Sequence, residues 1–196
     1  FKKITKDLWE VQTEGADKII IRYNYYANQL DAGASYLDSN QLYINPVNCF
    51  FYVVGREQEE YTINFHLAED YEIACGLEKI KKHTLKANSF DELAECPLIA
   101  SNSLQHNSYK IEDTSFHIWM QGPCSPDWKK ILNDFKAFTT SQINHFGGFP
   151  TKEYHFLFQI TPYRSYHGVE HTNNTVILLG PANKINDSRI IIKAFI

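Results

Sequence analysis

The sequence contains no long apolar segment. No run approaches the roughly 18 apolar residues that a helix needs to span a bilayer, and residues 1–10 lack the apolar core of a signal peptide. These absences predict no membrane partner. They leave the compartment open, with the cytoplasm favoured and the periplasm or export as alternatives.

An excess of positive charge is also absent. The chain carries 19 Lys and Arg against 23 Asp and Glu, a formal net charge of −4, and the two signs are interspersed. Nucleic-acid-binding domains usually present a strongly basic face. The composition therefore predicts no nucleic-acid partner.

The cysteines form no C-x-x-C pair, so their spacing gives little support for a metal site. We expect them to be buried core residues or free thiols. Up to two disulfides are the alternative if the protein is exported. The four positions are Cys49, Cys75, Cys96 and Cys124.

Aromatic residues are abundant, with 12 Tyr, 13 Phe and 3 Trp in a chain of 196 residues. Aromatic and β-branched side chains favour strands, and the length suits one large domain or two small ones. Short strand-like segments separated by turns predict an N-terminal β-sandwich over residues 1–121. The expected strands lie at Lys18–Tyr26, Leu42–Ile44, Cys49–Val54, Tyr61–Leu67 and Lys110–Trp119.

Two helical segments are expected. Ser89 followed by Glu92 is typical of a capped helical turn. A longer helix should begin with Ser125 as its capping residue and end at Gly147 and Gly148. Its apolar residues recur at helical spacing and should form one buried face: Trp128, Ile131, Leu132, Phe135 and Phe138.

Strand-like segments follow this helix at Tyr154–Thr161 and Thr175–Leu179. The order of helix, strand, loop and strand over residues 122–196 fits the opening of an α+β catalytic domain. The predicted fold is therefore mainly β, with an incomplete α+β second domain after the sandwich.

The loop between these strands has two chemical interpretations. His167-x-x-Glu170-His171 matches the H-x-x-E-H pattern of one class of zinc peptidase, whose two histidines must lie on one face of a helix. Gly168 and the residues 172–174 are poor helix formers, which favours an extended segment instead.

In the extended interpretation, Gly168 lets another backbone approach closely. Glu170 can then hold a cationic group such as the terminal ammonium of a peptide. The alternative is that Glu170 pairs with nearby Arg164 or stays solvated.

Several segments resemble the glycyl aminopeptidase family, zinc metallopeptidases of the thermolysin-like clan. Tyr166–Thr175 is similar to that family's Tyr-Gly-Gly-Leu-Glu-His-x-x-Ser/Thr segment, with His167 in place of the first glycine. Further similarities occur in the family's order along most of the chain, at Ile21–Ala27, Tyr36–Asp38, Ser89–Pro97, Phe146–Pro150 and Tyr154–Leu157.

The resemblance implies an N-terminal fragment of a zinc-dependent aminopeptidase that removes N-terminal glycine or other small residues from peptides. In that family, zinc polarises the scissile carbonyl and activates water. The resemblance, and a similarity to the Gly-x-Met-Glu-Asn segments of related aminopeptidases, assign Glu170 to the substrate's ammonium. They assign Gly168 to the approach of the peptide backbone, and His171 to the lining of the cleft.

The zinc-binding helix of that family, H-E-x-x-H, does not occur here, and none of the eight histidines opens it. Ser188–Ile196 is strand-like instead. We therefore expect zinc in the full-length parent, with no metal ligand or catalytic residue in this chain, which resembles the front part of such an enzyme. The alternative is a non-catalytic β-sandwich module that binds peptides or proteins.

Overall fold

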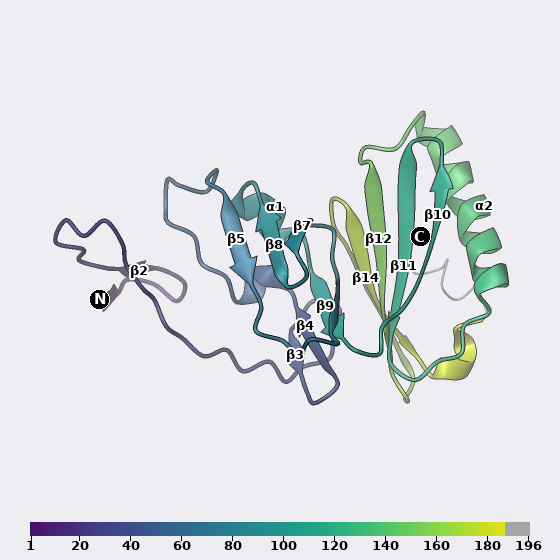
Figure 1. Cartoon of the computed structure of the whole chain (residues 1–196), viewed down its shortest axis with the longest axis horizontal. Coiled ribbons are helices and arrows are strands. Elements are labelled where there is room, and N and C mark those ends of the chain that lie inside the picture. Colours follow the sequence, from purple (N-terminus) through teal and green to yellow (C-terminus); the bar gives the residue numbers. More distant parts are fainter. Residues whose placement is uncertain (187–196) are drawn as a thin grey trace.

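The computed structural model describes residues 1–186, and the predicted strand at Ser188–Ile196 lies outside them. The described part consists mostly of strands, with one long helix at one side (Figure 1). A short hairpin of β1 (Lys2–Lys3) and β2 (Trp9–Glu10) lies at the N-terminal end. No helix within residues 1–186 is long and apolar enough to cross a membrane.

Two sheets form the N-terminal half. One has the order β3-β4-β9-β6 and the other the order β5-β8-β7. Side chains of both sheets share one apolar core, which includes Ile63 and Leu85 of one sheet and Ile73 and Leu98 of the other. This packing confirms the predicted β-sandwich. The strands are β3 (Tyr36–Leu37), β4 (Gln41–Ile44), β5 (Tyr61–Asn64), β6 (Glu72–Ala74), β7 (Glu78–Lys81), β8 (Thr84–Ala87) and β9 (Leu98–Ser101), with the 3-10 turn η1 (Pro46–Asn48) after β4.

The predicted helical turn is present as α1 (Phe90–Ala94). The Ser89 hydroxyl accepts a hydrogen bond from the Glu92 amide at 3.1 Å. The Glu92 carboxylate in turn accepts from the Asn88 amide at 2.6 Å. Because the Ser89 hydroxyl satisfies a first-turn amide that the helix leaves free, even this five-residue helix has a defined start.

A five-stranded sheet with the order β10-β11-β12-β14-β13 forms the other half. Its strands are β10 (Gln105–Ile111), β11 (Thr114–Gln121), β12 (Glu153–Ile160), β13 (Ser165–Glu170) and β14 (Asn174–Gly180), followed by the 3-10 turn η2 (Ala182–Lys184). The three central strands are parallel, and the helix α2 (Trp128–Phe146) makes the crossover from β11 to β12 (Figure 1).

The sheet is covered on both faces. One face packs against α2 through a core that includes Ile131, Phe135 and Phe158. The other packs against the N-terminal four-stranded sheet through a smaller core with Tyr43 and Leu157. Because β11 pairs with β12 along seven residues, the division expected between residues 121 and 122 would split this sheet. We propose that the domain boundary lies between β9 and β10 instead.

The long helix begins two residues later than predicted. Asp127, not Ser125, is the capping residue, and its carboxylate accepts from the Lys130 amide at 3.1 Å. Ile131 and Phe135 of the predicted apolar face are fully buried. The helix ends at Gly147, whose φ of 79° is the left-handed conformation that glycine adopts without strain, as predicted.

Replacing Asp127 by alanine should therefore lower the free energy of unfolding by about 1 kcal/mol, because the first-turn amide loses its acceptor. Urea unfolding followed by circular dichroism measures this change. Ser125→Ala is the matched control and should have almost no effect. A larger loss for Ser125→Ala than for Asp127→Ala would contradict the assignment of the cap.

Two predicted strands are wrong. Lys18–Tyr26 and Cys49–Val54 are rich in β-branched and aromatic residues but form no strand. The hydroxyl of Tyr23 donates to the Cys49 carbonyl at 2.6 Å, and its ring contacts Phe51, so the segments meet through side chains. Strand propensity reflects the fit to a half-buried pleated surface, and no neighbouring strand in the described residues supplies one.

Two other strand predictions need smaller corrections. The strand expected at Tyr61–Leu67 ends at Asn64. The segment Lys110–Trp119 contains the turn between β10 and β11, where Glu112 has a φ of 51°. All four cysteines are free thiols, and Cys75 and Cys96 are core residues as expected.

Candidate functional site

The segment His167-x-x-Glu170-His171 lies on an edge strand. β13 pairs with β14 alone, in antiparallel register, with Gly168 opposite Ile177 and Glu170 opposite Thr175. The extended backbone is confirmed, and the helical interpretation is wrong. In a strand, His167 and His171 are roughly 13 Å apart along the chain, so these residues do not fit a common zinc ion.

Alternate side chains of β13 face the N-terminal sandwich and hold the strand in place. The Nδ1 atom of His167 lies 2.9 Å from the Asp31 carboxylate. Val169 packs against the core shared with the four-stranded sheet. His171 follows in the same alternation, with its Nδ1 3.3 Å from Glu95, which also accepts from the Thr172 amide.

The other face of β13 carries Tyr166, Gly168 and Glu170, spaced two residues apart. Tyr166 and Glu170 are exposed, and within the described residues neither side chain forms a hydrogen bond or an ion pair. The alternative pairing of Glu170 with Arg164 is therefore not seen in this part of the chain. We call these three residues the outer stripe of β13.

The structure thus brings together two of the three predicted site residues. Gly168 and Glu170 share the outer stripe, whereas His171 faces the sandwich and contacts Glu95. Tyr166, which sequence reasoning left without a role, joins the stripe. The alternation of side chains in a strand is the signal that could have separated His171 from Glu170.

The charge of the Glu170 carboxylate affects the pKa of a tyrosine in the same sheet. Burial raises the pKa of the Tyr154 phenol, its hydrogen bond with Thr175 opposes that shift, and the charge of Glu170 adds to it. Tyr154 and Thr175 lie on β12 and β14, on the face of the sheet that α2 covers. The outer stripe therefore places a negative charge at the edge of that face.

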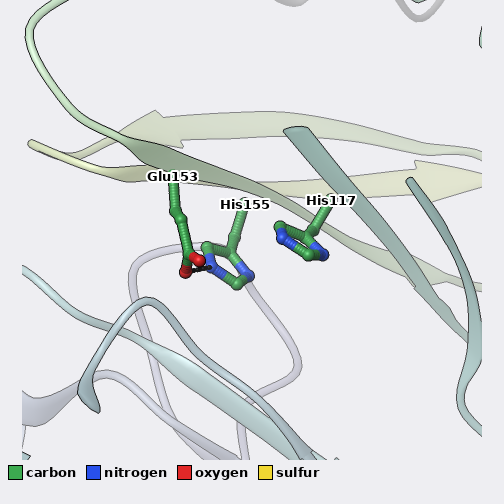
Figure 2. Close-up of side chains that lie close together, drawn as sticks. All are labelled: His117, Glu153 and His155. Atoms are coloured by element: carbon green, nitrogen blue, oxygen red, sulfur yellow. Dashed lines mark ion pairs between the residues drawn. The ribbon is translucent and has the colours of Figure 1, made fainter. Parts of the chain in front are cut away.

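A second group of side chains lies on the opposite face of the sheet. His117 of β11 and His155 and Glu153 of β12 point toward one another (Figure 2). Each offers one ligand atom, and these atoms lie within 4.8 Å of one another. Sequence reasoning missed this group because its residues come from two strands separated by α2.

Comparison with known protein families identifies the family of the N-terminal half. The sequence profile of the peptidase M61 N-terminal domain matches residues 1–102. The chain belongs to this family. The match ends where β9 ends, which supports the domain boundary proposed above.

The M61 N-terminal domain and the sheet that follows it also match solved structures. An aminopeptidase N family protein from Idiomarina loihiensis superposes with a TM-score of 0.72 at 22% identity, over 78% of this chain and 27% of its own. This likeness shows the fold, and the chain spans only about a quarter of the length of that structure. No curated protein matches the chain.

More distant matches are two mutant M1 zinc metallopeptidases. One, from Deinococcus radiodurans, holds a Tyr-Ser-Ala substrate and matches with a TM-score of 0.39 at 13% identity, over 69% of this chain and 32% of its own. The other, a two-domain enzyme bound to L-arginine, matches with a TM-score of 0.39 at 12% identity over the same shares. These likenesses are too low to support conclusions about this chain.

Proposed function

We propose that β13 binds peptide substrates by their free amino terminus, as part of a zinc-dependent aminopeptidase. The observation that carries this proposal is the outer stripe of β13, an exposed Tyr166–Gly168–Glu170 row on an edge strand. An edge strand presents backbone N–H and C=O groups that an extended peptide can pair with. The membership in the M61 N-terminal domain family agrees with a peptidase parent.

Each residue of the outer stripe has its own role in this proposal. Glu170 is the acceptor for the substrate's terminal ammonium, because a carboxylate without a protein partner makes a strong charge-assisted hydrogen bond to a cation. Gly168 leaves room for the peptide backbone, since it carries no side chain. Tyr166 borders the same row and limits the space beside it.

The contacts on the inner side of β13 support the role of the outer side. Asp31 and Glu95 hold His167 and His171 against the sandwich, and Val169 is packed between them. A strand fixed from behind presents its outer stripe in one orientation. Such pre-organisation lowers the entropy that binding costs.

The finer parts of the proposal concern specificity and metal. We propose that the parent removes N-terminal glycine or other small residues. The zinc ligands do not come from His167 and His171, whose placement on a strand does not fit them. The ligands belong to another part of the parent.

Hydrolysis of aminoacyl p-nitroanilides by the complete protein that contains this chain tests the proposal. We expect the kcat/KM of the glycyl substrate to exceed that of its N-acetylated form by at least about 100-fold, the difference expected when a charge pair to the ammonium is lost. Leucyl and glycyl substrates compared at equal concentration report the preference for small residues. Peptide binding without hydrolysis would instead favour a binding module.

A further inference from the structure

A row of imidazoles crosses the face of the five-stranded sheet that is turned toward the sandwich. His117 and His155 are direct partners in the parallel register of β11 and β12. Their rings stack with centroids 4.7 Å apart. Glu153 lies two residues before His155 and therefore on the same face, with a carboxylate oxygen 3.9 Å from the His155 Nε2 atom (Figure 2).

His155 lies between His117 and Glu153. Its side chain is 7% exposed, and its Nε2 atom is buried without a hydrogen-bond partner. The Glu153 oxygen is too distant to be that partner. An unpaired polar atom in this position costs stability, and a ligand held between Nε2 and the nearby carboxylate would remove that cost.

The neighbours of the row fix which nitrogen atoms are available. The Nδ1 atom of His117 lies 3.1 Å from His106 Nε2, which leaves His117 Nε2 for another partner. Trp119 donates its indole N–H to His155 Nδ1 at 3.2 Å. The Trp119 bond places the proton of the neutral His155 ring on Nε2, so a metal at Nε2 must displace that proton.

The imidazoles of His106, His117 and His155 all have lowered pKa values. Burial lowers the pKa of His155 to about 3, and the neighbouring histidines add to the shift. Burial likewise lowers the pKa of His117 and of His106, although the Glu153 carboxylate opposes the shift at His117.

We propose that His117, His155 and Glu153 form a site for a divalent transition metal of the zinc class. Two imidazole nitrogens and one carboxylate are a donor set that suits zinc. Ligand atoms on one tetrahedral zinc lie about 3.3 Å apart. The side chains must therefore close in by about 1.5 Å at most, and the stacked rings of His117 and His155 must turn so that their in-plane lone pairs converge.

The surroundings allow this adjustment. The Glu153 side chain is 65% exposed, so it can change rotamer freely, and water can fill the remaining coordination position. The proposed metal would join β11 to β12 at one end of their paired region. Its role would be structural, since the strands it joins form the centre of the sheet.

Metal binding has a specific consequence for Trp119. The tryptophan N–H donates to His155 Nδ1, so that the proton of the neutral ring lies on Nε2. A metal on Nε2 moves this proton to Nδ1, which then can no longer accept from Trp119. Metal binding should therefore change the tryptophan fluorescence, and Trp119→Phe should bind metal more tightly because the competing donor is gone.

Zinc titration of the chelator-treated 196-residue chain tests the site, with Co²⁺ as a spectroscopic probe. We expect one metal per chain, a zinc-dependent rise in Tm, and affinities at least about tenfold weaker in His117→Gln, His155→Gln and Glu153→Gln. The exposed Glu153 serves as the variant that leaves the fold intact. His66→Gln and His167→Gln are the controls and should bind as the wild type does.

Two results would overturn the proposal. One is the absence of zinc binding at micromolar concentrations in the wild-type chain. The other is that His155→Gln and Glu153→Gln still bind zinc while His167→Gln does not. That result would mean that the H-x-x-E-H segment binds the metal. The first outcome leaves peptide binding at β13 untouched, because the two sites share no residue, whereas the second would also contradict the role proposed for Glu170.

Discussion

Replacing Glu170 by glutamine should lower the kcat/KM of the complete protein for peptides with a free amino terminus by roughly 100-fold. Glutamine keeps the shape of the side chain but removes the charge that faces the ammonium. Breaking a charge pair of this kind costs about 2–5 kcal/mol where water is excluded, and about 2.8 kcal/mol corresponds to the stated factor. Steady-state kinetics with a peptide and its N-acetylated form measure the effect.

The N-acetylated peptide is the internal control, because it carries no ammonium for Glu170 to bind. Its already slow turnover should change by less than about threefold. Glu78→Gln, an exposed strand glutamate of the N-terminal sandwich, is the matched control variant and should leave both substrates unaffected. An equal loss on both forms of the peptide would show that Glu170 does not act through the ammonium.

The second large effect is a loss of stability, expected from a substitution in the core between α2 and the five-stranded sheet. Phe135 of α2 is fully buried, and its ring makes edge contacts with Phe156 at 5.0 Å and Phe158 at 6.1 Å. Replacing Phe135 by alanine removes this packing and leaves a cavity between helix and sheet. The free energy of unfolding should fall by about 3–5 kcal/mol.

Urea unfolding followed by far-ultraviolet circular dichroism measures this loss. Phe146→Ala removes the same side chain at a position that is 77% exposed, and it should change the free energy of unfolding by less than about 0.5 kcal/mol. A loss below 1 kcal/mol for Phe135→Ala would mean that α2 is not packed on this sheet as described.

Local signals in the sequence predicted much of the second half. Glycines correctly predicted the end of α2 at Gly147, whereas the segment that forms β13 was expected as a polar loop between two strands. Gly168 within the H-x-x-E-H pattern correctly favoured an extended backbone over a helix. Each of these inferences depends on neighbouring residues, for which short-range physical chemistry is sufficient.

Contacts between distant segments could not be predicted in the same way. The pairing of His117 with His155 depends on the register of two parallel strands joined by a long crossover. The contact of His171 with Glu95 joins two halves of the chain. Strand-like composition at Lys18–Tyr26 was misleading for the same reason, since a strand requires a partner that no local pattern supplies.

The placement of β13 connects these observations with the proposed function. The sandwich contributes Asp31 and Glu95, which hold the inner side of the strand. The five-stranded sheet contributes β14, which pairs with its backbone. The outer stripe of β13 is therefore positioned by both halves of the molecule, as the proposed function requires.

A crystal structure of the complete protein with a bound peptide tests the central claim most directly. We predict that the peptide lies antiparallel along β13, with its terminal nitrogen about 2.8 Å from a carboxylate oxygen of Glu170. A peptide whose ammonium is held by a different carboxylate, with Glu170 still facing solvent, would contradict the proposed role of this strand.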